Sequence, residues 1–410
     1  LTSDDFTLTE DGDAISATEA QASVTVRVND REATGRGSIY LSDVWAWPDP
    51  NLDHDHRDGK LRALCDAIAG DLVALCGGEP AHPLSLGLRL HDAVCEGDQA
   101  WDVPSILARA MCLSPFDAAI HDAAGLALGI SAFDFYTEDD PLPEADSWFD
   151  GDGACASIGA FMLTQPRKEF EAWWAVSKDE SLDGAFANAV RERGYRCFKL
   201  KTTGRDIESD ALRTAEVYRA ARSLGTARPR LVVDSNEATP DAAAVLSYLH
   251  CLRAVDENAF AAVDYLEQPT GRDIQTHRFD WRDVTALKPV VLDEGLTSLS
   301  LLPEALAQGW SGLALKTCKG HSTALTAAAW ANRNNMLISL QDLTNPGLAA
   351  IHAALFAAHV PMINGVELNS PQFTPAANQA WQPRLGGLLQ PTGGVHRLPD
   401  AKPCGLGSQM

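Results

Sequence analysis

Short apolar segments that each end in polar residues recur through the second part of this chain, and this repetition is its strongest constraint on the fold. A segment of helix length follows most of them, as in the Ala-rich stretches Ile207–Leu224 and Ser322–Asn334. Strands that alternate with helices predict a parallel sheet. The eight expected strands are Ala154–Phe161, Arg196–Lys201, Arg230–Asn236, Val263–Pro269, Val290–Gly295, Gly312–Thr317, Met336–Asp342 and Ile363–Leu368.

Eight strand–helix units fit a closed, TIM-like (β/α)8 barrel of the α/β class. A doubly wound open sheet is the alternative fold. It is disfavoured because no GxGxxG motif follows the first expected strand.

The N-terminal part of the chain has a different pattern. Residues 20–29 alternate between apolar and polar side chains and predict a strand, and a second strand is expected at Gly35–Leu41. Helical patterns follow at Asp58–Leu75 and at Val103–Leu128, the latter interrupted by Pro115. We therefore expect an α+β domain over residues 1–135, a polar linker at Thr137–Gly153, and the barrel over residues 150–385.

Composition excludes several classes of partner. The net charge of −23 opposes binding to nucleic acid or to anionic lipid, so neither is expected. The longest apolar runs are far too short to span a bilayer. Asp4, Asp5, Glu10 and Asp11 lie where a signal peptide would need basic and apolar residues, which favours a cytoplasmic protein. The nine cysteines lack CxxC spacing and are interpreted as reduced thiols.

Polar residues at the carboxyl ends of barrel strands face a common site, so the strand ends are considered together. Lysine is scarce, with nine in the chain, yet four lysines lie at strand ends: Lys199, Lys201, Lys316 and Lys319. Lys199 and Lys201 alternate along one strand and therefore point the same way. Carboxylates end the third, fourth and fifth expected strands, between the two lysine-bearing strands: Asp234, Glu267 and Asp293.

Three carboxylates without a histidine or cysteine partner suit a hard, oxygen-binding cation, which predicts Mg²⁺ as the cofactor. Such a cation can hold a substrate carboxylate and stabilise the enediolate formed when the α-proton leaves. Lysines near the cation and near one another are expected to have lowered pKa values, so that one of them serves as a base. The non-catalytic alternatives are that the carboxylates cap the following helices and that the lysines lie at solvated strand edges.

This ordered set of residues resembles the enolase superfamily. Lysines on both the second and the sixth strand resemble the muconate-lactonizing-enzyme-like subgroup of its mandelate racemase/muconate lactonizing enzyme family. Residues Ala119–Gly125 resemble the cap-helix motif of that family, Val366–Leu368 its eighth-strand motif, and Cys404–Gly407 its C-terminal PGLG signature with the proline replaced. The resemblance implies that residues 1–135 form a capping domain and that the tail, residues 386–410, completes it.

The resemblance implies a role for each site residue. Asp234, Glu267 and Asp293 would bind Mg²⁺. Lys201 and Lys316 would act as base and acid on opposite faces of the substrate, with Lys199 tuning Lys201. Asn236 and Glu294 are expected to orient the metal ligands. Glu367 is expected either to contact substrate or Lys316, or to make a structural hydrogen bond.

The expected activity is racemisation, epimerisation or cycloisomerisation of a small carboxylate substrate through its enediolate. Dehydration of an acid sugar or a hydroxy acid is the alternative within the superfamily. A Schiff-base lyase that uses Lys316 is an alternative from another reaction class. That chemistry needs no carboxylate triad, so the three carboxylates argue against it. A non-catalytic binding protein on the same barrel is a third possibility. A homo-oligomer is expected from the family.

The chain also departs from the family pattern. Gly320-His321 replaces the usual Gly-Gly, and Lys319 is an additional lysine without an assigned role. Gln341-Asp342 lacks the histidine of a mandelate-racemase-like dyad, which argues against that subgroup. His321 is expected to cap a helix or face solvent, and the acidic segment Asp53–Asp58 to form a solvated loop. Two tryptophan pairs, Trp45/Trp47 and Trp173/Trp174, are interpreted as buried aromatics or as the lining of an apolar pocket.

Overall fold

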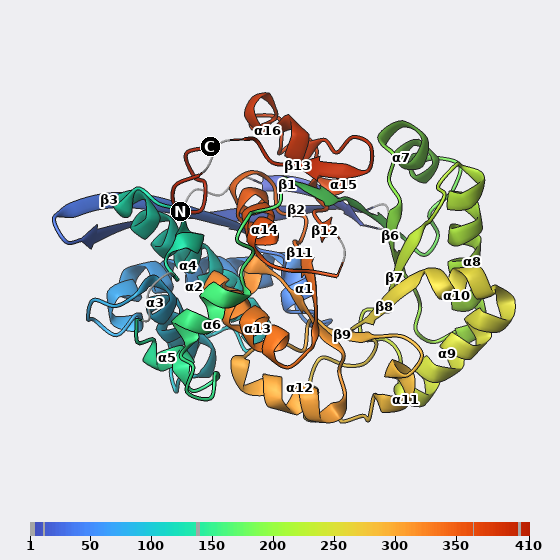
Figure 1. Cartoon of the computed structure of the whole chain (residues 1–410), viewed down its shortest axis with the longest axis horizontal. Helices are drawn as coiled ribbons and strands as arrows, with labels where there is room; N and C mark the ends of the chain where they lie inside the picture. The colour runs from blue at the N-terminus through green and yellow to red at the C-terminus, as the bar shows by residue number, and fades with distance from the viewer. Residues whose placement is uncertain (1–4, 11–12, 137–139, 364, 401–402) are drawn as a thin grey trace.

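The computed structural model describes residues 5–10, 13–136, 140–363, 365–400 and 403–410. Asp4 and Asp11, and residues 137–139 of the predicted linker, lie outside these residues. Figure 1 shows a long antiparallel sheet with helices beside it, and a barrel whose strands are surrounded by helices. Among the described residues, no helix combines the length and the apolar character that crossing a membrane requires.

The N-terminal sheet has three antiparallel strands, β1 (Asp5–Glu10), β2 (Asp13–Val28) and β3 (Arg31–Tyr40), in that order. The predicted strands at residues 20–29 and 35–41 are parts of β2 and β3. Helix α4 (Ile106–Leu128) packs against this sheet at very short range. A Cβ atom on Gly37 would lie 2.1 Å from the carbonyl oxygen of Pro115, so only glycine permits this contact.

Helix α4 is not interrupted at Pro115, which corrects the sequence-based expectation. Pro115 has no N–H to donate to the carbonyl of Met111 four residues earlier. The Ser114 hydroxyl donates to that carbonyl instead, at 2.8 Å. The neighbouring serine thus supplies the hydrogen bond that the proline removes, and the helix continues through it.

The barrel consists of eight parallel strands in sequential order. A parallel bridge between Ala172 and Val366 joins the first strand region to the last. The strands are β5 (Trp173–Val176), β6 (Cys197–Lys201), β7 (Arg230–Asp234), β8 (Val263–Glu267), β9 (Val290–Leu292), β10 (Gly312–Leu315), β11 (Leu337–Gln341) and β12 (Val366–Glu367).

Seven of the eight predicted strands coincide with these, but the first was wrong. Residues Ala154–Phe161 form helix α6, in which Ala154, Ile158 and Phe161 are buried at helical spacing. The first barrel strand is Trp173–Val176, whose four side chains are all buried. A short apolar run cannot be assigned to helix or strand by its period alone, and here the aromatic and β-branched run is the strand.

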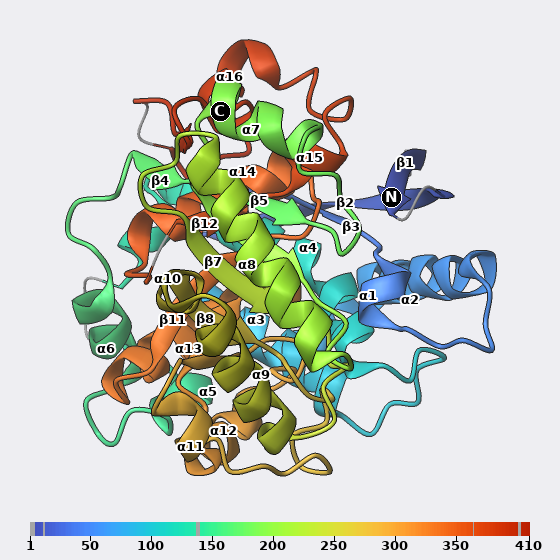
Figure 2. The ribbon, with the colours of Figure 1, turned by 90° about the vertical axis from the view of Figure 1, so that its right-hand side faces the viewer.

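Helices cover the outside of the barrel, and Figure 2 shows α8 and α9 side by side on one face. The barrel helices are α7 (Ala185–Arg193), α8 (Ile207–Ser223), α9 (Ala242–Val255), α10 (Glu257–Ala262), α11 (Arg282–Thr285), α12 (Leu302–Gln308), α13 (His321–Arg333) and α14 (Gly347–His359). The remaining helices are α1 (Asp43–Ala46), α2 (His54–Leu75), α3 (Pro83–His91), α5 (Pro143–Asp146), α15 (Ser370–Phe373) and α16 (Gln382–Leu389).

The C-terminal tail reaches both parts of the molecule. Strand β13 (Val395–Arg397) pairs with β4 (Glu169–Glu171), which precedes the first barrel strand. Further on, the backbone N–H of Leu406 donates to Asp122 of helix α4 at 2.8 Å. The domain boundaries near residues 135, 150 and 385 stay predictions; below, "cap" denotes the N-terminal sheet with helices α1 to α4.

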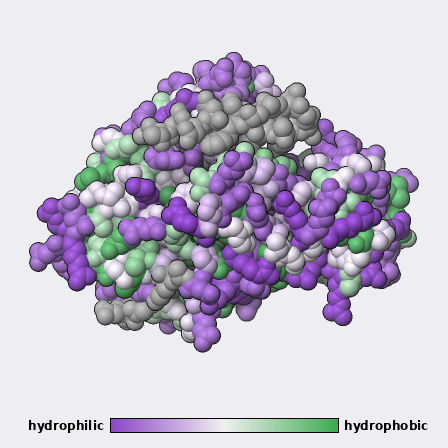
Figure 3. All heavy atoms as spheres, turned by 90° about the horizontal axis from the view of Figure 1, so that it is seen from above, coloured by the Kyte–Doolittle hydropathy of each residue, from purple (hydrophilic) through white to green (hydrophobic). Residues whose placement is uncertain are grey.

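A buried layer inside the barrel supports the strand ends. It takes one side chain from each of the first six strands: Trp173, Cys197, Val232, Tyr265, Val291 and Ala314. Tyr265 shares a 2.6 Å hydrogen bond with Ser339 on β11, which joins two barrel strands that are not neighbours. The face in Figure 3 is mainly hydrophilic, and its hydrophobic residues lie in small separate groups.

Candidate active site

The two lysines of β6 both point into the barrel mouth, as their alternation predicts. Lys199 Nζ is buried and lies 2.7 Å from Glu267 Oε1, 3.0 Å from Glu367 Oε2 and 3.3 Å from Asp234 Oδ2. Lys201 Nζ donates to the same Asp234 oxygen at 2.7 Å. One ammonium group therefore bridges Asp234 and Glu267, and a second holds Asp234 from the solvent side.

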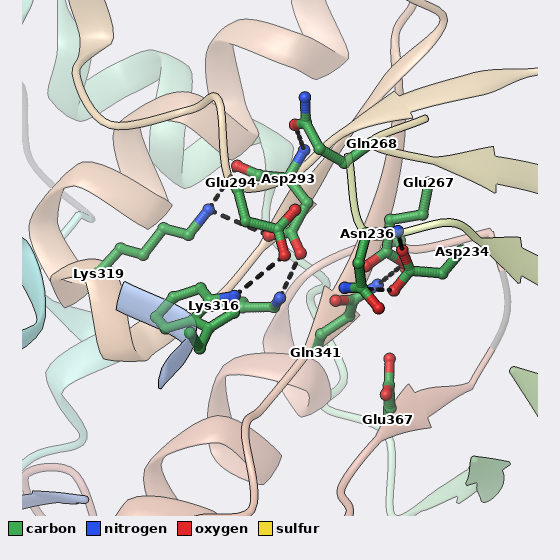
Figure 4. Close-up of polar contacts among 12 residues, drawn as sticks. Asp234, Asn236, Glu267, Gln268, Asp293, Glu294, Lys316, Lys319, Gln341 and Glu367 are labelled. Carbon is green, nitrogen blue, oxygen red and sulfur yellow. Dashed lines mark hydrogen bonds and ion pairs between the residues drawn. The ribbon is translucent and has the colours of Figure 1, made fainter. Parts of the chain in front are cut away.

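A second lysine pair holds Asp293 on the other side of the mouth. Lys316 Nζ makes a very short contact with Asp293 Oδ2. Lys319 Nζ lies 3.1 Å from Asp293 Oδ1 and donates to the Asp293 carbonyl at 2.6 Å. Figure 4 shows both lysines approaching Asp293 together. Lys319 comes from the 3-10 turn Thr317–Lys319, which directly follows Lys316.

Amide side chains occupy the spaces between the charged groups. Gln341, at the end of β11, donates to Glu267 Oε2 at 2.5 Å. Gln268 Oε1 accepts from the backbone N–H groups of Asp293 and Gly295, both at 3.0 Å, and so joins the ends of β8 and β9 (Figure 4). Asn236 donates its backbone N–H to Asp234 Oδ1 at 2.8 Å, and its role in orienting a metal ligand stays a prediction.

The loops after β7 and β8 have unusual backbone conformations. Asn236, Glu237 and Gln268 have φ values of 45°, 67° and 31°. Non-glycine residues rarely adopt positive φ, and such strain concentrates at functional sites. The strain is located where the loops turn to direct Asp234 and Glu267 into the mouth.

Burial and the charges of neighbouring groups together set the pKa values in the mouth. Burial, reinforced by Asp234 and Asp293, raises the pKa of Glu267 to about 8 against the opposing effect of Lys199. Burial, with Asp293, raises the pKa of Glu294 to about 7. Burial alone would also raise the pKa of Asp293, but Lys316 and Lys319 hold it well below its ordinary value.

Contacts among the protein's own groups raise the pKa of two of the lysines, whereas the expectation of lowered pKa values concerns lysines beside the bound cation and stays a prediction. Burial by itself would lower the pKa of Lys199, but Glu267, Glu367, Asp234 and Asp293 together raise it well above its ordinary value. Burial likewise opposes the charged form of Lys316, and the contact with Asp293 outweighs it and raises the pKa. Each lysine has carboxylate neighbours close enough to offset the cost of burial.

Glu367 makes the structural hydrogen bonds that were one of the alternatives expected for it: it accepts from Lys199, and its other oxygen accepts from Asn369 at 2.7 Å. Two other expectations are corrected by the structure. His321 begins α13 but is buried against His121, and the Gly320 N-cap makes no side-chain bond. Segment Asp53–Asp58 is not a loop: Asp53 caps helix α2, which begins at His54.

Asp342 belongs to a buried polar link between barrel and cap. Asn345 donates to Asp342 Oδ1 at 2.9 Å and accepts from the backbone N–H of Tyr40, at the end of β3, also at 2.9 Å. Burial raises the pKa of Asp342 to about 8, because the hydrogen bond from Asn345 compensates only part of it. The structural role expected for Asp342 matches these contacts.

The sequence analysis missed two contacts with the site. Trp45 in the cap donates its indole N–H to Glu294 Oε1 at 3.0 Å, so Glu294 contacts the cap rather than a carboxylate that it was expected to orient. The sequence indicated only that Gln341 lies where a mandelate-racemase-like dyad would need a histidine, yet Gln341 contacts Glu267. Polarity at a strand end could have indicated Gln341. No local pattern indicates Trp45, because its partner is distant in the sequence.

Among the described residues, one group of three histidine or acidic side chains has ligand atoms within 4.8 Å of one another. It consists of His91, Asp92 and Glu96 at the π-helical turn η1 (Asp92–Glu96), where both carboxylates are exposed. The predicted ligands Asp234, Glu267 and Asp293 are not gathered in this way, since lysine ammonium groups lie between and beside them.

Comparisons with known proteins agree on one family. The family model described as "Enolase C-terminal domain-like" matches residues 183–410. A search of curated proteins found no match. Among solved structures, the muconate lactonizing enzyme from Klebsiella pneumoniae is 19% identical with a TM-score of 0.63, and covers 99% of this chain and 95% of its own.

Two further structures are similar over nearly their whole length. The muconate lactonizing enzyme from Pseudomonas putida is 18% identical with a TM-score of 0.65, covering 99% of this chain and 94% of its own. An enolase from Bradyrhizobium complexed with magnesium and mandelic acid is 17% identical with a TM-score of 0.62, covering 98% and 91%. These likenesses support the (β/α)8 barrel with an N-terminal α+β part. Together with the family model, they show that the chain belongs to the enolase superfamily, in its mandelate racemase/muconate lactonizing enzyme family.

Proposed function

We propose that this protein is a Mg²⁺-dependent enzyme that removes the α-proton of a carboxylate substrate, as a racemase, epimerase or cycloisomerase. One observation carries the proposal: two lysine pairs, on β6 and after β10, hold the carboxylates at the ends of the strands between them. The muconate lactonizing enzymes and the magnesium- and mandelate-bound enolase among the similar structures support the same class of chemistry.

The residues at the mouth fit a divalent cation. Asp234, Glu267 and Asp293 offer hard oxygen donors and are at most 1% exposed. Burial raises the pKa of Glu267 to about 8, and the negative charge of Asp234 and Asp293 adds to this effect while Lys199 opposes it. These three carboxylates would hold the ion. When bound, Mg²⁺ would hold the substrate carboxylate, stabilise the enediolate and lower the pKa of the nearby lysines by adding positive charge.

The lysines divide the proton transfers between them. Lys201, at the exposed end of β6, removes the α-proton from one face of the substrate. Lys316, which contacts Asp293 on the opposite side of the mouth, returns a proton to the other face. Lys199 remains paired with Glu267 and Glu367 and positions Lys201 through their shared partner Asp234. Two opposed lysines are what inversion at a carbon atom requires.

The test is α-proton exchange in D₂O, followed by NMR with saturating Mg²⁺ and pooled carboxylic acids (amino-acid derivatives, dipeptides and sugar acids). We expect at least one acid to exchange, and the exchange to disappear with a chelator. Lys178→Ala, at an exposed lysine outside the site, is the matched control and keeps the exchange. The same spectra reveal loss of water from a hydroxy acid, which would replace isomerisation by dehydration.

Activity that survives complete chelation contradicts the metal-dependent mechanism. A covalent adduct that borohydride traps on Lys316 would favour the Schiff-base alternative instead. Mg²⁺ binding without exchange of any pooled acid would place the substrate outside the pool. The absence of both binding and exchange would favour a non-catalytic barrel.

A further inference from the structure

Trp45 is a cap residue that is firmly attached to the rest of the cap. It lies on the single-turn helix α1, whose Asp43 accepts from Arg57 Nε at 2.8 Å and contacts His54 at 3.0 Å. The end of the same turn is held by Ser105, which donates to the Ala46 carbonyl at 2.5 Å. The position of Trp45 is therefore set by the cap.

The main chain and the side chain of Trp45 are both anchored to the barrel. Both terminal guanidinium nitrogens of Arg272 donate to the Trp45 carbonyl at 3.3 Å. Glu237 holds Arg272 in place, with a shortest contact of 2.6 Å. The indole N–H donates to Glu294, the residue next to Asp293.

The ring of Trp45 covers both lysines that hold Asp293. Its centroid lies 5.0 Å from Lys316 Nζ and 5.8 Å from Lys319 Nζ. The face of an indole ring attracts an ammonium group electrostatically, and more strongly when water is excluded. One cap side chain thus contacts two ammonium groups and the carboxylate that follows Asp293.

We propose that Trp45 is a positioning residue of the active site, which fixes Lys316 and Glu294 and keeps water from Lys316 when the cap lies on the barrel. The proposal rests on the proposed function, in which Lys316 returns the proton. It also gives Lys319 a role, because Lys319 holds Asp293 at its carbonyl and Oδ1 while Lys316 contacts Oδ2. Without Trp45, both oxygens of the buried Glu294 would lack a hydrogen-bond partner, since Oε2 already has none.

Three variants separate the ring, its N–H group and general damage to the cap. Trp45→Phe keeps an aromatic face and removes the N–H, whereas Trp45→Leu removes both. Trp101→Phe is the matched control, because Trp101 packs against the same cap core but lies outside the barrel mouth. Thermal unfolding of all three checks that each variant folds.

The first measurement does not depend on activity. Lysine acylation by acetic anhydride is followed by mass spectrometry, with exposed Lys178 as the internal standard. We expect Trp45→Leu to accelerate acylation of Lys316 and Lys319 by about three- to thirtyfold, the range that a lost cation–π contact supports. Trp45→Phe and Trp101→Phe should stay near the wild-type rate. Equal rates in Trp45→Leu and Trp101→Phe would overturn the proposal.

The second measurement uses the acid identified by α-proton exchange. Trp45→Leu should lower kcat by roughly ten- to hundredfold, as misplacement of a catalytic group does, with little change in KM. Trp45→Phe, which keeps the aromatic face over Lys316 and loses only the donor to Glu294, should lower kcat less than Trp45→Leu does, and Trp101→Phe should leave kcat unchanged. A change in KM alone would make Trp45 a substrate contact and overturn the proposal. If the wild type neither binds Mg²⁺ nor exchanges any acid, the proposed function fails, and the acylation rates alone decide whether Trp45 covers Lys316.

Discussion

The two lysine pairs of the site are built alike but are enclosed differently. On the β6 side, the Lys201 side chain is 32% exposed, and within the described part of the chain its ion pair is with Asp234 of the barrel strand β7. On the β10 side, the Lys316 side chain is 4% exposed, and Trp45 of the cap lies over it. One half of the site is therefore complete in the barrel, whereas the other half depends on where the cap lies.

Because of this difference, access to the two lysines is set by different parts of the molecule. Access to Lys201 is set by the mouth itself, whereas access to Lys316 depends on Trp45 of α1, which lies over it. Closure over only one of two opposed lysines would affect the two directions of proton transfer unequally. The following predictions test this asymmetry, beginning with the largest expected effect.

Replacing either lysine should abolish exchange for one enantiomer of the substrate. We expect Lys201→Ala and Lys316→Ala each to slow exchange of one enantiomer by about 10²- to 10⁴-fold, the usual contribution of a general acid or base. The opposite enantiomer should still exchange, with its configuration retained. NMR and polarimetry of the two pure enantiomers in D₂O measure this. Loss of the same enantiomer in both variants would contradict the opposed arrangement.

Mg²⁺ should require carboxylates from both sides of the site. We expect Asp234→Asn and Asp293→Asn each to weaken Mg²⁺ binding by at least about ten- to hundredfold, because loss of an outer-shell partner alone costs that much. Isothermal titration calorimetry measures the affinity, and Asp183→Asn, at an exposed aspartate, serves as the control. Wild-type affinity in either variant would place the ion on one side only.

Stability should depend on pH through Asp342, which links the cap to the barrel. Its pKa is about 8 in the folded protein against an ordinary value of 3.8, so the folded state retains a proton that the unfolded state has lost. Between these values, Asp342 should lower the free energy of unfolding by about 1.4 kcal/mol per pH unit as the pH rises. Asp342→Asn removes this contribution.

The stability of the Asp342→Asn variant relative to the wild type should therefore increase from pH 5 to pH 8. Chemical denaturation midpoints at three pH values measure the difference. Asp234 in the barrel should affect stability in the opposite direction. Burial would raise the pKa of Asp234, but Lys201 and Lys199 lower it. Its contribution to the free energy of unfolding is therefore lost as the pH falls. A constant difference between Asp342→Asn and wild type across this range would show that Asp342 is ionised in the folded state.

The smallest effect is expected at the anchor of the Trp45 main chain. Arg272→Gln removes the guanidinium contacts to the Trp45 carbonyl while the indole contact to Glu294 remains. We expect acylation of Lys316 to increase by no more than about threefold, the lower end for an exposed cation–π contact. Lys201 should be unaffected. A larger change at Lys201 than at Lys316 would contradict the asymmetry between the two sides.

The sequence predicted which residues lie at the barrel mouth, because strand periodicity and strand order are enough to place them. Lys199 and Lys201 point inward together because side chains alternate along a strand. Asp234, Glu267 and Asp293 meet at one edge because the carboxyl ends of parallel strands share it. The same reasoning gave a wrong first barrel strand. The segment Ala154–Phe161 is apolar enough for a strand or a helix, and its burial at helical spacing depends on neighbouring elements that the segment itself does not encode.

The sequence by itself determined the order of the barrel strands from β6 onward, the residues at their ends and the superfamily that this order resembles. Only the tertiary structure decided which lysine is exposed, in which direction the pKa values of Lys199 and Lys316 shift, and that Trp45 lies over Lys316. The physical reason is the sequence separation over which each effect acts. Strand periodicity acts between neighbours, whereas burial and charge compensation depend on groups such as Trp45 and Glu294, which folding brings together from distant parts of the chain.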